Sequence, residues 1–454
     1  MVGPPVLRRQ SMGLKVAKFG GSSVADVIQF KKVRSIVQAD PTRKIVVVSA
    51  PGKRYPNDTK LTDLLYLCQT HVEHNLPWDQ LFQVVSDRFT AMALSLGLHS
   101  DQLDLEPEFE TIRKDLNGGA GADYIASRGE YLNGLLMARF LGFEFMDAAG
   151  LLLFDERGHF LPDETDQALR DALRNCEGVV IPGFYGSTSG GRIKTFSRGG
   201  SDITGSVIAR AMHADVYENW TDVHGFLVAD PRIVKDPQPI DYITYQELRE
   251  LSYMGASVLH EDAIFPVRET NIPINIRNTN AADHPGTTIL ADVPRDPDKI
   301  VTGIAGSKDF TVIALYKHMM NKERGFVRRL FGILEDYDLG FEHLPTGIDT
   351  MSLVLSNEKI ADRLPDIVAD IEKKLEPDNI EVNDDIALIA TVGRGMSSRK
   401  GVSAALFTAL AEADINVRLI DQGSSEMNII VGVLNQDFEK AIRAIYEAFI
   451  GGRK

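Results

Sequence analysis

The chain has 454 residues, 44% of them hydrophobic, and a formal net charge of −15 at neutral pH. The length favours about two to four domains, and an acidic chain without a long basic run is not expected to bind nucleic acid or an anionic membrane surface. No apolar stretch reaches the roughly 18 residues of a membrane-spanning helix. Cys68 and Cys176 form no CxxC pair. We therefore expect reduced thiols and a cytoplasmic α/β protein.

An anion-binding turn is predicted after residues 1–13, which we expect to be a disordered leader or an expression remnant. Leu14–Phe19 predicts a strand, and a helix pattern over Val24–Val37 follows it after Gly20-Gly21-Ser22-Ser23. Glycines let backbone N–H groups approach a phosphate, and a helix N-terminus adds unpaired donors. Lys18 adds a full charge for a transferred phosphoryl group. Such turns also occur without a ligand, so the other motifs decide.

Apolar strands and amphipathic helices then alternate, which predicts an open, mostly parallel sheet with helices on both faces. The helical segment Trp78–Leu116 contains no evident chemistry and is expected only to cover the sheet. The polar, proline-containing segment Asn278–Lys299 predicts a linker at the end of a domain spanning 14–300. Strands are predicted at Ile45–Ser49, Phe145-Met146, Val179–Gly183, Asp215–Trp220 and Ile272–Ile276, and helices from Leu64 onward and at Tyr124–Leu141, Ile203–Met212 and Glu247–Gly255.

A second glycine turn, Ser197–Asp202, precedes a predicted helix N-terminus. Arg198 offers a forked donor for a carboxylate or a phosphate. Asp202 fits a helix cap, and it could also orient Lys18 or a metal ion. Thr221-Asp222 follows the next strand, and ligands of open α/β sheets bind beyond the carboxyl ends of strands.

The last third of the chain contains an internal repeat of strands and helices. Val327 and Val402, at matching places in two helices, are 75 positions apart, and Leu364 and Phe438 are 74 apart. The repeat predicts two ferredoxin-like βαββαβ units, at 301–376 and 377–454. Their strands are predicted at Phe310–Leu315, Gly340–Leu344, Met351–Leu355, Ile386–Val392, Val417–Ile420 and Asn428–Val433.

These motifs, in this order, resemble those of the aspartate kinases, a branch of the amino acid kinase family with tandem C-terminal ACT domains. Lys18–Ser23 matches the first signature, Ser197–Asp202 the second glycine turn, and Thr221-Asp222 with Asp230-Pro231-Arg232 the nucleotide loop. The resemblance extends from about residue 14 to the end of the chain. It implies phosphoryl transfer from MgATP to the side-chain carboxylate of L-aspartate, giving 4-phospho-L-aspartate, the first step of lysine, threonine and methionine biosynthesis.

The resemblance also implies residue roles. Lys18 and Asp202 would be catalytic, Glu130 would hold the substrate ammonium, and Arg198 a carboxylate. No general base is expected, because the attacking carboxylate is already ionised near neutral pH, and no metal bound by protein residues alone is predicted. Substrate contacts are expected at Ser49, Thr62, Glu130, Arg198, Gly199, Gly200 and Ser201, and nucleotide contacts at Lys18, Gly20, Gly21, Ser22, Thr221, Asp222, Arg232 and Ser257.

Two departures from the family pattern concern the nucleotide. Leu227 stands where the family commonly has Tyr, and Ser257 where it often has Lys. The ACT region is expected to bind an amino-acid effector, lysine first and threonine second, and to pair subunits as a homodimer or a tetramer. Asp349 also fits an ordinary turn residue. The effector residues are expected to be Met320, Arg324, Gly325, Phe326, Asp349 and Thr350.

Two alternatives stay open. The first is an amino acid kinase for N-acetylglutamate or glutamate, since a fold does not determine its substrate. Glu130 suits a free amine, and the tandem repeat is not expected in those enzymes. The second is a non-catalytic amino-acid sensor, against which the intact Lys18, Arg198 and Asp202 argue. We expect no fused second enzyme, because nothing follows Lys454.

Overall fold

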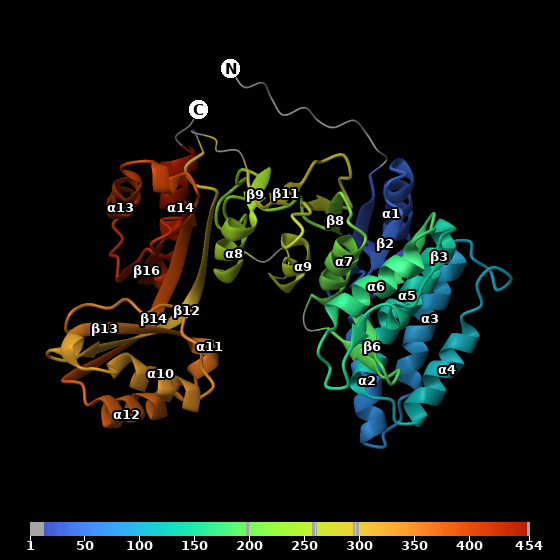
Figure 1. Ribbon diagram of the computed structural model, residues 1–454, viewed down its shortest axis with the longest axis horizontal. Helices are drawn as coiled ribbons and strands as arrows, with labels where there is room; N and C mark the ends of the chain where they lie inside the picture. The colour runs from blue at the N-terminus through green and yellow to red at the C-terminus, as the bar shows by residue number, and fades with distance from the viewer. Residues whose placement is uncertain are drawn as a thin grey trace. The chain divides into compact units, whose positions relative to one another are not determined.

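The computed structural model describes residues 13–196, 199–256, 259, 261–293, 296 and 299–451. The chain divides into two compact units (Figure 1). The first unit comprises Met1–Phe226, Asp241–Tyr245 and Val258–Val293, and the second comprises Leu227–Ile240, Gln246–Ser257 and Pro294–Lys454. No helix among the described residues is long and apolar enough to cross a membrane.

The first unit is built on an eight-stranded sheet with the order β3-β5-β2-β1-β8-β10-β11-β9. Only the β10–β11 pair is antiparallel, which confirms the predicted, mostly parallel sheet. The strands are β1 (Lys15–Phe19), β2 (Ile45–Val48), β3 (Glu144–Phe145), β5 (Val179–Pro182), β8 (Val216–Thr221), β9 (Tyr242–Thr244), β10 (Ile274–Asn278) and β11 (Thr287–Leu290). A smaller sheet contains β4 (Leu153–Phe154), β6 (Tyr185–Thr188) and β7 (Ile193–Thr195).

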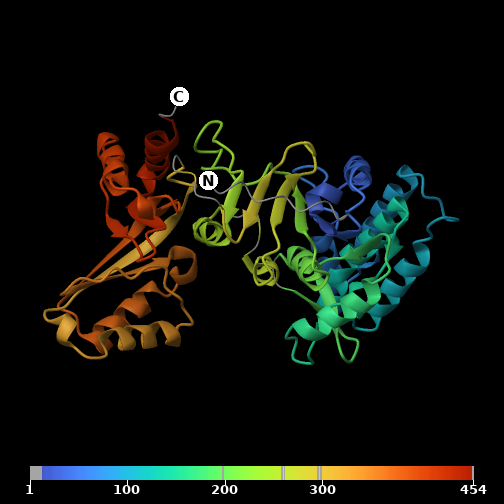
Figure 2. The same ribbon diagram turned by 45° about the horizontal axis from the view of Figure 1, so that its top comes forward.

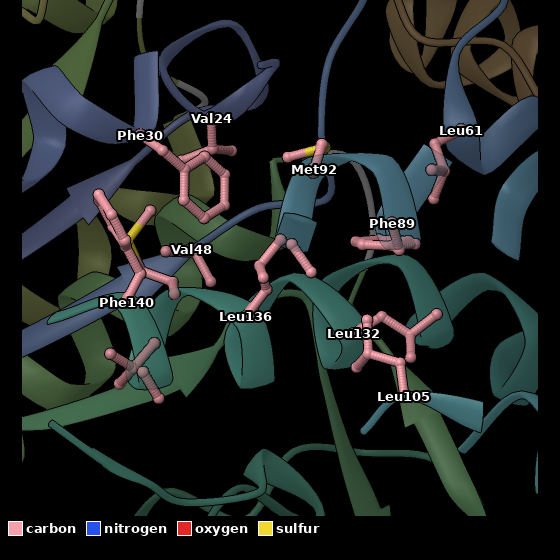
Figure 3. Close-up of a cluster of buried hydrophobic side chains, with 14 of the residues drawn as sticks. Val24, Phe30, Val48, Leu61, Phe89, Met92, Leu105, Leu132, Leu136 and Phe140 are labelled. Atoms are coloured by element: carbon pink, nitrogen blue, oxygen red, sulfur yellow. The ribbon is translucent and has the colours of Figure 1, made fainter. Parts of the chain in front are cut away.

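Helices complete this unit and share a core with the sheet. Figure 3 shows part of that core, in which Phe89 and Met92 lie near Leu132 and Leu136. The predicted cover over Trp78–Leu116 is therefore an integral part of the core, because its aromatic side chains are buried. The helices are α1 (Val27–Ala39), α2 (Leu61–Glu73), α3 (Asp79–Ser95), α4 (Glu106–Asn117), α5 (Ala122–Leu141), α6 (Pro162–Leu173), α7 (Gly200–Ala211) and α9 (Phe265–Arg268).

The alternation of side chains along β1 places one lysine on the functional face. Ala17 and Phe19 belong to the core cluster that includes residues of α1, α3 and α5. Successive side chains of a strand point to opposite faces, so Lys18 points to the other face, where it meets Asp202 of α7.

Two local predictions in this unit are wrong. The helix predicted from Val24 begins at Val27, because a 3₁₀ turn (Gly21–Val24) comes first and Asp26 caps the helix by accepting the N–H of Gln29 at 2.9 Å. The predicted linker over Asn278–Lys299 contains β11, which pairs with β10. That strand depends on a partner brought in by the fold, and its neighbouring prolines conceal it in the sequence.

The second unit contains a five-stranded antiparallel sheet with the order β13-β12-β14-β16-β15. The predicted strand Gly340–Leu344 is wrong: that segment has a single bridge, from His343 to Val354, since it lacks a continuous partner. The strands are β12 (Gly303–Tyr316), β13 (Thr350–Ser356), β14 (Asn379–Val392), β15 (Leu419–Asp421) and β16 (Asn428–Leu434). The helices are α8 (Tyr245–Tyr253), α10 (Phe326–Asp336), α11 (Asn357–Ile360), α12 (Leu364–Leu375), α13 (Val402–Glu412) and α14 (Phe438–Tyr446).

The two repeats are interleaved through their longest strands, which run side by side (Figure 2). The first part of β12, Gly303 to Ser307, pairs with the last part of β14, Val392 to Leu388. The remaining part of β12 pairs with the first part of β14. The second repeat therefore receives a strand segment from residues at the start of the range predicted for the first repeat.

The segment Leu227–Ile240 is fastened to the same unit by hydrogen bonds. The N–H of Ile304 donates to the carbonyl of Val228 at 2.7 Å, and Nε of Arg443 donates to the carbonyl of Ile233 at 2.9 Å. The N–H of Gln238 donates to the hydroxyl of Tyr446 at 3.1 Å. The predicted nucleotide loop is thus held by the ACT-type sheet and its last helix.

Candidate active site

A cavity of about 410 Å³ lies where β1 and β2 end and α2 and α7 begin. Most of the residues that line it are polar. The two glycine turns predicted from the sequence lie here, one after β1 and one before α7. Most of the predicted catalytic and substrate residues meet here. The lining residues are Lys18, Ser49, Lys60, Thr62, Tyr66, Glu130, Phe184, Gly199, Gly200, Ser201 and Asp202.

A buried ion pair forms the centre of the cavity wall. Nζ of Lys18 lies 2.5 Å from Oδ1 of Asp202, and both side chains are largely shielded from solvent. Nδ2 of Asn219 donates to the same Oδ1 at 2.8 Å. Sequence reasoning missed Asn219, although the parallel register of β1 and β8 places it opposite Lys18. Asp202 thus fixes Lys18 at the end of its strand.

The second glycine turn is needed for close backbone approach. Gly199 has φ 76°, a left-handed conformation that starts α7 at small cost only for glycine. A Cβ on Gly200 would lie 2.6 Å from a ring carbon of Phe184, whose own φ is 79°. A Cβ on Gly183 would lie 2.7 Å from that of Ser201. The turn is therefore packed directly against the end of β5.

The first glycine turn lies against the loop that follows β2. The N–H of Gly52 donates to the carbonyl of Gly21 at 2.8 Å, and a Cβ on Gly52 would lie 2.7 Å from the carbonyl carbon of Gly21. The N–H of Gly20 donates to the carbonyl of Trp220 at 2.9 Å. Ser22 is half-buried within the same turn. The predicted phosphate turn is thus pinned on two sides.

The substrate side of the cavity is formed by the end of β2 and the start of α2. The carbonyl of Ser49 accepts a hydrogen bond from Nδ2 of Asn133 at 2.7 Å, which ties it to α5. Thr62 lies in the first turn of α2, and Lys60 immediately precedes that helix. Lys60, Tyr66 and Phe184 were not predicted. Among the described residues, the Lys60 ammonium has no hydrogen-bond or ion-pair partner.

Glu130 is a buried acid on α5 with unused capacity for hydrogen bonding. It is 5% exposed, and its Oε2 has no hydrogen-bond partner among the described residues. Burial raises the pKa of Glu130 to about 8, although the N–H of Ala50 and the charges of Lys18 and Arg128 oppose this shift. A buried carboxyl with a free oxygen suits a cationic partner supplied by a ligand.

The predicted nucleotide residues are not all part of this cavity. Thr221 ends β8, and Asp222 follows it as an exposed residue whose carbonyl accepts a hydrogen bond from Nδ2 of Asn278 at 3.2 Å. Arg232 belongs to the second unit, where its guanidinium bonds to Asp230. Arg198 and Ser257 lie outside the described residues.

The predicted effector residues surround the start of α10. Gly325 precedes that helix with φ 80°, and Met320 and Phe326 are buried, whereas Arg324 is exposed. Oδ1 of Asp349 accepts the N–H of Met319 at 2.8 Å, so this carboxylate braces its own loop, as a turn residue would. Thr350 begins β13 and is exposed.

The matching part of the second repeat contains a cavity. Its volume is about 520 Å³, and Met396, Gly401 and Val402 line it. These residues follow Met320, Gly325 and Phe326 by 76 positions each (396 − 320, 401 − 325 and 402 − 326). Val402 therefore matches Phe326, the first residue of α10, and the predicted match to Val327 is wrong by one residue. The segment Met320–Phe326, predicted to bind the effector, thus corresponds in the second repeat to a segment that lines a cavity.

Family models match most of the chain. The model of the amino acid kinase family matches residues 13–278, and that of the ACT domain matches residues 389–449. Among characterised proteins, the chain is 38% identical to aspartokinase 3 of Bacillus subtilis over 459 aligned residues, which cover 97% of this chain and 99% of the relative.

Solved structures give a consistent result. The chain matches the aspartate kinase of Clostridium acetobutylicum with a TM-score of 0.89 and 50% sequence identity, over 96% of this chain and 100% of that one. Escherichia coli aspartokinase III was solved with aspartate and ADP and with lysine and aspartate. It matches with TM-scores of 0.72 and 0.74, at 25% identity, over 96% of this chain and 99% of that protein.

Proposed function

Because the chain belongs to the amino acid kinase family and, within it, is an aspartate kinase, we propose how its own residues transfer a phosphoryl group from ATP to the side chain of L-aspartate. The observation that carries the proposal is the pairing of Lys18 with Asp202 in a cavity that also contains the buried Glu130. One cation beside the reacting groups and one acid for the substrate ammonium are what this reaction requires.

Lys18 stabilises the negative charge on the transferred phosphoryl group. The ion pair with Asp202 and the bond from Asn219 to that carboxylate hold Nζ at the end of β1. A donor that is fixed before reaction needs no reorganisation when charge develops in the transition state. Catalysis then depends on positioning and charge neutralisation, because the aspartate carboxylate is already the nucleophile.

The aspartate molecule lies on the α2 and α5 side of the cavity. Its ammonium group binds Glu130, and its arrival supplies the partner that Oε2 lacks. Ser49 and Thr62 supply polar groups around the acceptor carboxylate, and Gly199 to Ser201 line the same cavity. Arg198, in the same glycine turn, binds the second carboxylate, which makes the site selective for an amino acid with two acidic groups.

Nucleotide binding requires the glycine turn Gly20–Ser22 together with Thr221 and Asp222 at the end of β8. Magnesium accompanies the phosphates, and the residues present fit that form of binding. The described residues contain no cluster of three or more potential ligands, and Mg²⁺ usually takes one or two carboxylates plus phosphate oxygens. Asp202 would hold it through Oδ2, since Oδ1 takes the bonds from Lys18 and Asn219. The ion would neutralise phosphate charge.

Regulation is expected to act through the ACT-type unit. E. coli aspartokinase III, which this chain resembles, was solved with bound lysine. We therefore place lysine first among the effectors of this chain and threonine second, with Met320, Arg324, Gly325, Phe326, Asp349 and Thr350 near the bound amino acid. Pairing of two chains through their ACT units as a homodimer, with a tetramer as the larger assembly, completes the proposal.

The test is formation of an acyl phosphate from ATP and amino acid, trapped with hydroxylamine as the hydroxamate. Product is expected with L-aspartate and not with glutamate or N-acetylglutamate, and lysine is expected to inhibit. Product with N-acetylglutamate alone would indicate the other kinase class. If no substrate gives product while ATP still binds, the chain is a sensor.

A further inference from the structure

A buried arginine from the covering helices reaches the two loops of the active site. Arg88 lies on α3, and its side chain is 5% exposed. One of its terminal nitrogens, Nη2, donates to the carbonyl of Gly52 at 2.5 Å and to the carbonyl of Ala25 at 3.2 Å. The other, Nη1, lies 3.6 Å from Oδ2 of Asp58. One planar guanidinium therefore joins three points of the chain.

Those points belong to the two segments that meet at the site. Ala25 directly follows the 3₁₀ turn that contains Gly21, and Gly52 donates its N–H to the carbonyl of Gly21. Ser49 precedes the loop that Gly52 and Asp58 belong to, and Lys60 ends it. The phosphate turn and the substrate loop are thus joined directly by the Gly52–Gly21 bond and a second time through Arg88.

The loop itself is folded around Asp58. The side chain of Asp58 is 7% exposed and accepts three hydrogen bonds from Arg54: one from the backbone N–H and two from the guanidinium, at 2.8 to 3.0 Å. These bonds leave the loop compact but do not attach it to the glycine turn. The Gly52–Gly21 bond makes one such attachment, and Arg88, which does not line the cavity, makes a second through the carbonyls of Gly52 and Ala25.

A contribution to folding stability does not explain why a charged residue is buried at position 88. Burying a charge costs free energy, and well-packed apolar residues often replace buried ion pairs without loss. Nε of Arg88 also lacks a hydrogen-bond partner among the described residues. Neighbouring positions on the same helix, such as Phe89 and Val85, fill the core with apolar side chains. The charged group is needed where it reaches the two carbonyls.

We infer that Arg88 is a positioning residue for phosphoryl transfer, which holds the Ser49–Lys60 loop at its working distance from the glycine turn. This inference rests on the function proposed above. When Arg88 is lost, the glycine turn keeps its own bond to Trp220, and the substrate loop keeps its Gly52–Gly21 bond but loses the second attachment. The substrate loop is therefore the part that moves. A displacement of about 1 Å at a reacting group can cost about 100-fold in rate.

The test compares full-length wild type with Arg88→Lys and Arg88→Met, measuring kcat, the KM for each substrate and the thermal midpoint. Lysine keeps the charge but lacks the planar fork that serves several acceptors at once. We expect Arg88→Lys to raise the aspartate KM and to lower kcat, each by about tenfold, with the ATP KM within about twofold of wild type. Arg113→Lys, on α4 with a surface partner in Glu106, is the control and is expected to match wild type.

A purely structural role predicts a different pattern. Activity would then fall only in proportion to the folded fraction, with both KM values unchanged, and that result would overturn the inference. If Arg88→Met does not fold, Asp58→Asn decides: it must raise the aspartate KM, and combining it with Arg88→Lys must add less than the product of the two effects. An inactive wild type overturns the proposed function and this inference together. An active wild type with unaltered Arg88→Lys overturns only the inference.

Discussion

Nζ of Lys18 lies 2.5 Å from Oδ1 of Asp202, and this pair joins the first strand of the sheet to the first turn of α7. Lys18→Met removes the charge and leaves the Asp202 carboxylate, among the residues that the structure describes, with the bond from Asn219. We expect kcat to fall by about 10²- to 10³-fold, the usual cost of losing one fixed donor at a developing anion. The circular dichroism spectrum is expected to stay unchanged. Steady-state kinetics check this result.

Asp202→Asn tests the two proposed roles of that carboxylate, which are to hold Lys18 and to bind magnesium. It keeps a side chain of the same shape but removes the charge that holds Lys18, so we expect kcat to fall with the ATP dependence also altered through magnesium. Glu164→Gln, at an exposed acid on α6, is the control. Wild-type turnover in either active-site variant would remove that residue from the proposed reaction.

The raised pKa of Glu130 predicts how aspartate binding responds to pH. With a pKa of about 8, the free enzyme holds this carboxyl protonated at pH 6 to 7, and an ammonium ligand requires its ionised form. We expect the aspartate KM to fall about tenfold per pH unit between pH 6 and 8 and to level off above pH 8. Glu130→Gln is expected to bind aspartate weakly with no such slope.

The same shift has a consequence for stability, whose sign follows from linkage. The folded pKa lies above the ordinary value of 4.5, so Glu130 supports the ligand-free fold fully below about pH 4.5 and loses that contribution as pH rises through 8. Glu130→Gln is therefore expected to lose less stability than wild type between pH 5 and 8. Denaturant titrations at both pH values measure it, and equal pH dependence in the two proteins would contradict the assigned pKa.

Much of the first unit could be predicted from its sequence, because local patterns determine its parts. Strands such as Ile45–Val48 are continuous apolar runs. The turns before α1 and α7 contain glycine because the backbone there lies too close to neighbouring atoms for a side chain. Lys18 and Asp202 were each placed beside such a turn. Their contact then required only the usual geometry of a parallel sheet.

What could not be predicted depends on partners distant in the sequence. The strand Thr287–Leu290 forms between β10 and β9, and Asn219 matters only because β1 lies beside β8. Arg88 lies within a helical pattern that gives no indication of the loops above it. The pairing of β12 with β14 could not be predicted from the internal repeat, because similarity between two segments does not indicate which strands pair.

Lys60 supplies a cation at the cavity that no described residue neutralises. Since Lys18 is paired with Asp202, a substrate carrying phosphate and carboxylate charges would draw Lys60 into contact. We expect Lys60→Met to lower kcat/KM for aspartate about tenfold, and Lys60→Arg to retain most of it. Lys53→Met, in the same loop with its ammonium bonded to the carbonyl of Pro56, is the control. Equal effects at both lysines would indicate a general loop charge rather than a contact.

The hydroxyl of Tyr446 on α14 accepts the N–H of Gln238, six residues after Arg232 in the predicted nucleotide loop. Tyr446→Phe removes the acceptor of that N–H and so loosens the loop. We expect the ATP KM to rise about threefold or more while the aspartate KM stays unchanged, and inhibition by the effector to weaken because the loop is less firmly coupled to the ACT-type sheet. Tyr337→Phe, at a half-buried residue just after α10 whose hydroxyl donates to Asp370 at 3.4 Å, is the control for removing a hydroxyl from the same unit. An unchanged ATP KM in Tyr446→Phe, with inhibition intact, would show that the last helix only closes the second unit and does not act on the nucleotide.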